Sequence, residues 1–284
     1  MHRSISLRSF LSATWLGWKI ESNWTDPLLF AIYSIIKPLA GAAILVVMYS
    51  IISQADFQSP YFAYLFIGNA FYQYVAAVLT GVSWAIIDDR EHYRTLKYIY
   101  TAPLNMPTFL LGRGVARFLT ATFAVVITLL MGKIFFKLPI HLAQVDWGLF
   151  ILSLLLGVYM LAMLGLLLAG ITLRVAQHAG GIGEAVGGGL FLFSGAIFPL
   201  SVLPGFLQPI GYIFPVSFWL ELIRRSLLGA QSAQVWSFAS LSNAQLLGIL
   251  VAMTAFYTVF SIWMFRILEN AARERGNIDL TTNY

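Results

Sequence analysis

Long apolar segments separated by short polar stretches dominate this chain of 284 residues. Each segment holds about 20 residues or more, which lets an α-helix cross a hydrocarbon core of about 30 Å. We expect six membrane-spanning helices, at residues 27–52, 60–87, 107–135, 147–173, 179–200 and 243–267. The pattern therefore predicts an all-α polytopic membrane protein whose transmembrane domain covers residues 27–267.

The remaining segments predict helices at the membrane surface. Residues 1–26 alternate short apolar groups with single charges, which favours an amphipathic helix in the plane of the interface. Between spans five and six, prolines interrupt an apolar run, and non-helical backbone cannot face lipid. We expect one or two re-entrant or surface helices there, on the outer side of the bundle. Residues 268–284 form a charged tail.

The distribution of basic residues predicts the orientation of the chain. Twelve Lys and Arg residues lie on the side of the two termini, and four lie on the opposite side. By the positive-inside rule, both termini are cytoplasmic. The absence of cysteine excludes disulfides, thiolate metal sites and cysteine nucleophiles. The net charge of +5 is scattered over segment ends, which argues against nucleic-acid binding.

The densest charged stretch, residues 88–103, lies between the second and third expected spans. Residues that recur there at helical spacing are Tyr93, Leu96 and Tyr100. Two carboxylates, Asp88 and Asp89, stand at its start, where they favour the positive end of a helix dipole. We expect a short amphipathic helix that presents a charged face to a soluble partner, formed by Arg90, Glu91 and Arg94. A solvated polar loop is the alternative.

Polar side chains inside the expected spans mark a possible pathway. Asn69, Tyr72 and Gln73 lie in the second span, where they either bond a neighbouring helix or offer polar contacts to amphipathic cargo. Glu184 lies in the fifth span, and a carboxylate at mid-membrane costs about 2.5–3.5 kcal/mol. It therefore contacts cargo or a proton, or it pairs with Arg174 or an arginine of the third span.

Other unusual residues favour structural roles. The glycines between residues 180 and 189 predict close helix packing, at an interhelical or subunit seam. They lack the G-x-x-x-x-G-K-[ST] pattern of a phosphate loop. Lys37 lies close enough to the cytoplasmic end of its span to reach the interface. Glu221 is spaced for a helical ion pair with Arg224 or Arg225.

Two stretches resemble one family of transporters. Residues 90–103 resemble the E-x-G-T-L-x-x-L-x-x-x-P stretch that follows the second span of type-2 ABC transporter permeases. Residues 194–204, followed by Pro215 and Glu221-x-x-Arg224, resemble an outer stretch of the same family, and the six-span layout matches along the chain. Arg94 stands where the family has a small residue, and one additional residue precedes it.

The resemblance implies the membrane subunit of an ATP-binding cassette exporter in a bacterial plasma membrane, forming a homodimer. Residues 88–103 are then the coupling helix, which docks a separate ATPase subunit. The docking residues are Asp89, Arg90, Glu91, His92, Tyr93, Arg94, Thr95 and Leu96. We expect ATP and Mg²⁺ on that partner and no cofactor on this chain, which has no Walker motif. Tyr93, Leu96 and Tyr100 are expected to anchor the helix under the bundle.

The cargo is narrowed to two classes. A hydrophobic drug or lipid-like molecule is favoured by the aromatic second span and the apolar fifth span, with Asn69, Tyr72, Gln73 and Glu184 as pathway residues. A lipid-linked polysaccharide is the alternative.

An intramembrane serine protease is disfavoured, because Leu192 replaces the first glycine of a G-x-S-G motif and no histidine follows His178. A passive channel remains a further alternative.

Overall fold

The computed structural model describes residues 2–22, 27–54, 56–175, 179–229 and 235–278, and these contain helices and no strands. The α-helices are α1 (His2–Ser22), α2 (Pro27–Ile52), α3 (Pro60–Tyr74), α4 (Thr80–Ile87), α5 (Leu96–Thr101), α6 (Met106–Phe136), α7 (Trp147–Arg174), α8 (Ala179–Phe193), α9 (Gln208–Ile213), α10 (Pro215–Leu228) and α11 (Asn243–Glu274). Two π-helical turns, η1 (Val75–Leu79) and η2 (Asp88–His92), and one 3-10 turn, η3 (Leu200–Val202), complete them.

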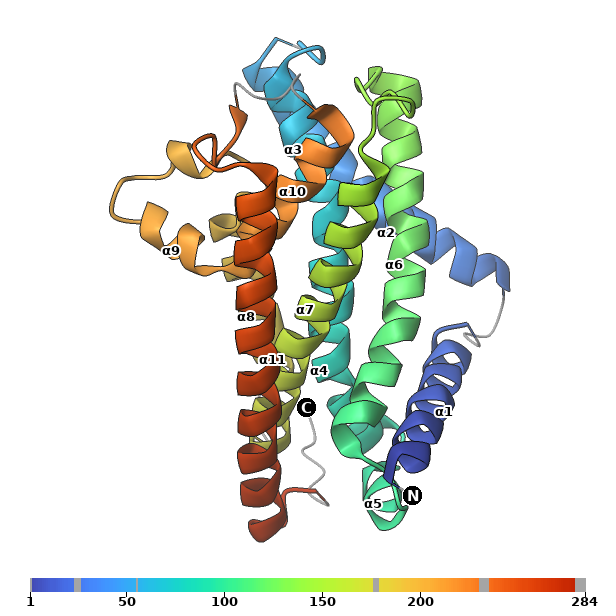
Figure 1. The fold of residues 1–284 in the computed structure, drawn as a ribbon. Helices are drawn as coiled ribbons and strands as arrows, with labels where there is room; N and C mark the ends of the chain where they lie inside the picture. Colours follow the sequence, from blue (N-terminus) through green and yellow to red (C-terminus); the bar gives the residue numbers. More distant parts are fainter. Residues whose placement is uncertain (1, 23–26, 55, 176–178, 230–234, 279–284) are drawn as a thin grey trace.

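Four helices in the described part of the chain are long and apolar enough to cross a membrane. They are the continuous helix Pro60–His92, built from α3, η1, α4 and η2, together with α6, α7 and α11. The helix Pro60–His92 is the most buried of the four, and α6 and α7 both pack against it. Figure 1 shows these helices side by side, with α5 at one end of the bundle and α10 near the other.

Two of the expected spans, which correspond to α2 and α8, are not among these four helices. In α2, which matches the expected bounds, the described apolar stretch is Leu39–Ile52, and the side chain of Lys37 lies outside the described residues. Helix α8 has 15 residues and a length of about 22 Å, so it ends before the expected boundary at residue 200. A positive φ of 72° at Gly195 turns the chain away soon after Phe193. The structure thus supports four spans, and six stays a prediction.

The segment between α8 and α11 contains η3, α9 and α10. Every residue of α10 is buried, because this helix packs against α3, α7 and α11. The prolines start these helices instead of interrupting them: Pro209 and Pro215 occupy first-turn positions, where their missing N–H is not needed. The last helix continues to Glu274, beyond the expected end of the sixth span at residue 267.

Candidate functional site at the polar end of the bundle

The segment 88–103 is not one helix that begins at Asp88. The helix from Pro60 runs through η2, and α5 starts only at Leu96. Asp88 and Asp89 therefore lie at the carboxyl end of a helix, where the helix dipole disfavours negative charge. The expectation that these aspartates start a helix is therefore wrong. Arginines on another helix compensate their charge at this position. We call this end of the bundle, where α1, η2, α5, α6 and α11 meet, the polar end.

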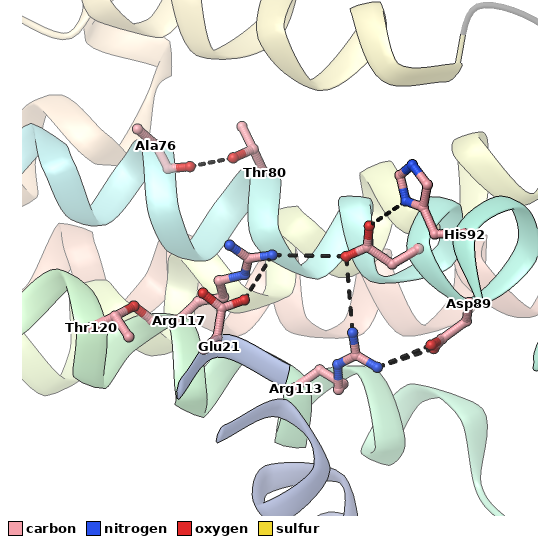
Figure 2. Close-up of polar contacts among 9 residues, drawn as sticks. Glu21, Ala76, Thr80, Asp89, His92, Arg113, Arg117 and Thr120 are labelled. Carbon is pink, nitrogen blue, oxygen red and sulfur yellow. Dashed lines mark hydrogen bonds and ion pairs between the residues drawn. The ribbon is translucent and has the colours of Figure 1, made fainter. Parts of the chain in front are cut away.

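Two arginines of α6 compensate the charge of the aspartates (Figure 2). Arg113 donates from Nη1 to both carboxylate oxygens of Asp89, at 3.0 and 3.3 Å, and both side chains are buried. Its Nη2 lies 4.0 Å from Oδ2 of Asp88. Arg117 lies one helical turn further along α6, with Nη2 3.8 Å from the same Asp88 oxygen. The network thus joins η2 to α6.

Arg117 also joins α1 to the network. Its Nη2 lies 2.9 Å from Oε1 of Glu21, near the end of α1. Burial raises the pKa of Glu21 above its usual value, and the charge of Arg117 opposes this shift. Helix α1 approaches α6 closely at Gly112, where an added Cβ would lie 2.5 Å from the carbonyl oxygen of Phe10. The first helix is therefore locked against α6 by packing and by charge.

Arg90 and Glu91 face the protein. Arg90 is buried, donates from Nε to Oε1 of Glu91 at 2.9 Å, and donates from Nη1 to the carbonyl of Thr172 at 3.3 Å. That carbonyl lies in the last turn of α7, where it has no partner within the helix. The side chain of Glu91 is 7% exposed. The expectation that Arg90 and Glu91 face away is therefore wrong, because they form this ion pair inside the polar end.

A tight turn at Tyr93–Thr95 joins η2 to α5. The amide of Tyr93 donates to the carbonyl of Asp88 at 2.8 Å, and the amide of Thr95 donates to that of Asp89 at 2.7 Å. Arg94 has a φ of 53°, a conformation that favours glycine. The wide turn of η2 takes up one residue more than an α-helical turn. The additional residue and the arginine at position 94, the two departures from the permease pattern, are thus both accommodated within η2 and this turn.

Helix α5 is anchored by one face. Leu96 is 1% exposed and belongs to a buried cluster with residues of five other helices, among them Ala13, Phe109, Leu173 and Phe265. The guanidinium of Arg273, near the end of α11, lies over the ring of Tyr100 at 4.9 Å. Leu96 and Tyr100 therefore lie where an anchor is expected. Tyr93 does not, because it is 48% exposed.

The outward side of the same segment is basic and aromatic. The exposed residues there include His92, Tyr93, Arg94, Lys97 and Tyr98, and we call this set of five the exposed loop surface. The ammonium group of Lys97 lies over the ring of Tyr98 at 5.3 Å. Within this set, Nδ1 of His92 lies 3.0 Å from Oδ1 of Asp88. The neighbouring acids Asp88, Asp89 and Glu91 all take part in ion pairs, as described above. Thr95 is half-buried behind this surface.

The expected pathway residues do not gather in one place. The hydroxyl of Tyr72 donates to the carbonyl of Gly187, and its ring lies 4.8 Å from that of Phe191. Gln73 instead donates from Nε2 to Thr128 of α6 at 3.0 Å. Asn69 is half-buried, whereas Glu184 is exposed on α8. The amide of Gln73 thus bonds a neighbouring helix, which was the structural alternative.

A second polar cluster lies in α10, toward the opposite end. Arg224 is buried and donates to the carbonyls of Tyr64, Gly195 and Ala196, so it ties α3 to the turn after α8. Arg225 donates from Nε to Glu221 at 3.1 Å, which agrees with the spacing read from the sequence. Sequence reasoning missed the backbone contacts of Arg224. The signal was an arginine within a strongly apolar run, which needs partners when buried.

The four long apolar helices of the described residues indicate a multi-pass membrane protein. A family model described as "ABC-2 type transporter" matches residues 9–228. The chain therefore belongs to the ABC-2 type transporter family, whose members are membrane permease subunits. No curated protein matches the chain.

Proposed function

We propose that this chain is the permease subunit of an ATP-binding cassette exporter, driven by a separate ATPase subunit that binds ATP and Mg²⁺. It moves a hydrophobic or amphipathic molecule out of the cytoplasm or the inner leaflet, as a homodimer in a bacterial plasma membrane with both termini cytoplasmic. The observation that carries this proposal is the exposed loop surface, which projects beyond the bundle while its flanking residues are firmly anchored.

A docking surface transmits force only if it cannot yield locally. Here Leu96 connects α5 to α1, α6, α7 and α11 through one buried cluster. The Asp89–Arg113 ion pair connects η2 to α6 by charge. A displacement of the loop by an ATPase subunit would therefore move several helices together. ATP then drives transport if the two arrangements of these helices differ in affinity for cargo or for the ATP-bound partner.

Removing the aromatic and basic side chains of the exposed loop surface tests the proposal. The chain is co-expressed with its proposed ATP-binding subunit, and the affinity of the purified pair is measured. We expect Lys97→Glu combined with Tyr98→Ala to weaken binding at least fivefold, a loss typical of central interface residues. The matched control is Lys133→Glu, which reverses an exposed charge near the opposite end of α6. Equal loss in both variants, or in neither, would contradict docking at this surface.

A further inference from the structure

One face of α8 is open and carries a carboxylate. Glu184 lies on this face with Gly181, Ala185 and Gly188, at the three- and four-residue spacing of one helix side. Apart from the adjacent residues and backbone of α8 itself, no atoms of the described structure lie within 4 Å of the position where a Cβ would stand at Gly181 or Gly188. The side of α8 that faces the bundle carries Gly183, next to Thr80, and the buried Leu190. Between the two sides lies Gly187, whose carbonyl accepts from Tyr72.

Glu184 has no polar partner among the described residues. It forms neither a hydrogen bond nor an ion pair there, although the chain carries more basic than acidic residues. The arginines of α6 are committed elsewhere, since Arg113 binds Asp89 and Arg117 binds Glu21. The alternative that Glu184 pairs with Arg174 or with an arginine of the third span is therefore wrong for this chain alone.

The surroundings of Glu184 are suited to an amphiphile. The residue is the sixth of α8, about 7.5 Å along the helix from its start. Beyond it the helix is apolar up to Phe193, and the exposed Leu192 lies four residues after Gly188, on the same side of the helix. The face therefore offers one negative charge close to one end and an apolar surface next to it. No group of three or more acidic or histidine side chains that would suit a metal ion occurs in the described part of the chain.

We propose that this face of α8 binds hydrophobic cations, with the positive group of the ligand against Glu184 and its apolar body along the helix towards Leu192. The proposal rests on the proposed export function, because it names the class of cargo. A cationic ligand would supply the counter-charge of Glu184, and a counter-charge stabilises an unpaired charge beside an apolar surface. The small side chains at 181, 185 and 188 leave room for the ligand beside the helix.

Binding of tetraphenylphosphonium to the purified chain tests the site directly. The chain is reconstituted in nanodiscs of zwitterionic phosphatidylcholine, without an ATPase subunit. We expect Glu184→Gln to weaken binding at least tenfold and Glu184→Asp to stay within about threefold of the unaltered chain. Glu274→Gln removes an exposed carboxylate at the end of α11 and should leave binding unchanged. Tetraphenylborate, which has the same shape and a negative charge, should bind the unaltered chain no better than the Glu184→Gln variant.

Equal binding of tetraphenylphosphonium to the unaltered chain and to Glu184→Gln would overturn the proposal. So would conversion of a dimer to a monomer by Glu184→Gln with unchanged binding, because the carboxylate would then pair with a second copy. The export function is measured separately, as ATP-driven uptake into inverted vesicles that contain the ATPase subunit. Charge-dependent binding without such uptake would support the site and contradict the exporter assignment. Uptake without charge-dependent binding would support the exporter assignment and contradict the site.

Discussion

The guanidinium of Arg113 donates two hydrogen bonds from Nη1 to the carboxylate of Asp89, at 3.0 and 3.3 Å, across the contact between α6 and the end of the helix Pro60–His92. Both side chains are buried. The pair lies directly behind the turn that presents the exposed loop surface. Its role is to hold that turn in place, because the amide of Thr95 bonds the backbone carbonyl of Asp89.

Removing one partner of this pair should be costly. We expect Arg113→Gln to destabilise the protein by about 3–5 kcal/mol, because it leaves the charge of Asp89 buried and only weakly compensated. Denaturant unfolding in detergent, followed by tryptophan fluorescence, measures the effect. The control is Arg273→Gln, which removes the half-exposed pair with Glu269 and the cation–π contact with Tyr100, and should cost less than about 2 kcal/mol. Equal losses of unfolding free energy in the two variants would show that the buried pair stabilises the protein no more than the half-exposed one.

The conformation of Arg94 gives a second prediction. Its φ of 53° disfavours a side chain by about 1–2 kcal/mol and is readily adopted by glycine. Arg94→Gly should therefore be more stable than Arg94→Ala by about 1 kcal/mol, since both variants lack the charge and only alanine keeps the strain. The same unfolding measurement applies. Equal stability of the two variants would mean that the turn relaxes without cost.

The contact of Gly157 with Trp219 gives a third prediction. A Cβ at Gly157 would overlap the buried indole ring of Trp219, which ties α7 to α10. We expect Gly157→Ala to destabilise the protein by about 1–3 kcal/mol, as overpacking does. Gly248→Ala, in α11, is the matched control: a Cβ there meets nothing within 4 Å, so helix propensity should make it neutral or stabilising by up to about 1 kcal/mol. Destabilisation by both alanines would contradict this packing.

The helices were predictable because apolar runs of a given length determine them locally. The expected spans at 107–135 and 147–173 agree with α6 and α7 within one residue at each end. The end of α8 was not predictable in the same way. A turn at Gly195, whose carbonyl is bonded by Arg224 from a distant helix, stops the chain inside a run that remains apolar.

The location of the polar end was predicted correctly, but the predicted roles of several of its residues were wrong. Charge density alone located residues 88–103 as the region of interest. The roles of Asp88 and Asp89 depend on arginines 24 to 29 residues further on, and such pairing is invisible to a reading of neighbouring residues. In the sequence, the arginines of the third span were considered only as partners for Glu184, not for these aspartates. Tyr93 and Leu96 share a helical spacing, but the turn at Arg94 sends them to opposite sides.

The most direct test asks whether the exposed loop surface faces the cytoplasm and is covered by the ATPase subunit. The chain contains no cysteine, so Tyr98→Cys and Val202→Cys each introduce a single exposed thiol, one at the polar end and one after α8. A membrane-impermeant maleimide should label the thiol at 98 only in inverted vesicles, and labelling should fall when the ATPase subunit is bound. The thiol at 202 should react only from outside whole cells, with or without that subunit. Labelling at position 98 from outside whole cells, or unchanged labelling with the ATPase subunit bound, would contradict the proposed function.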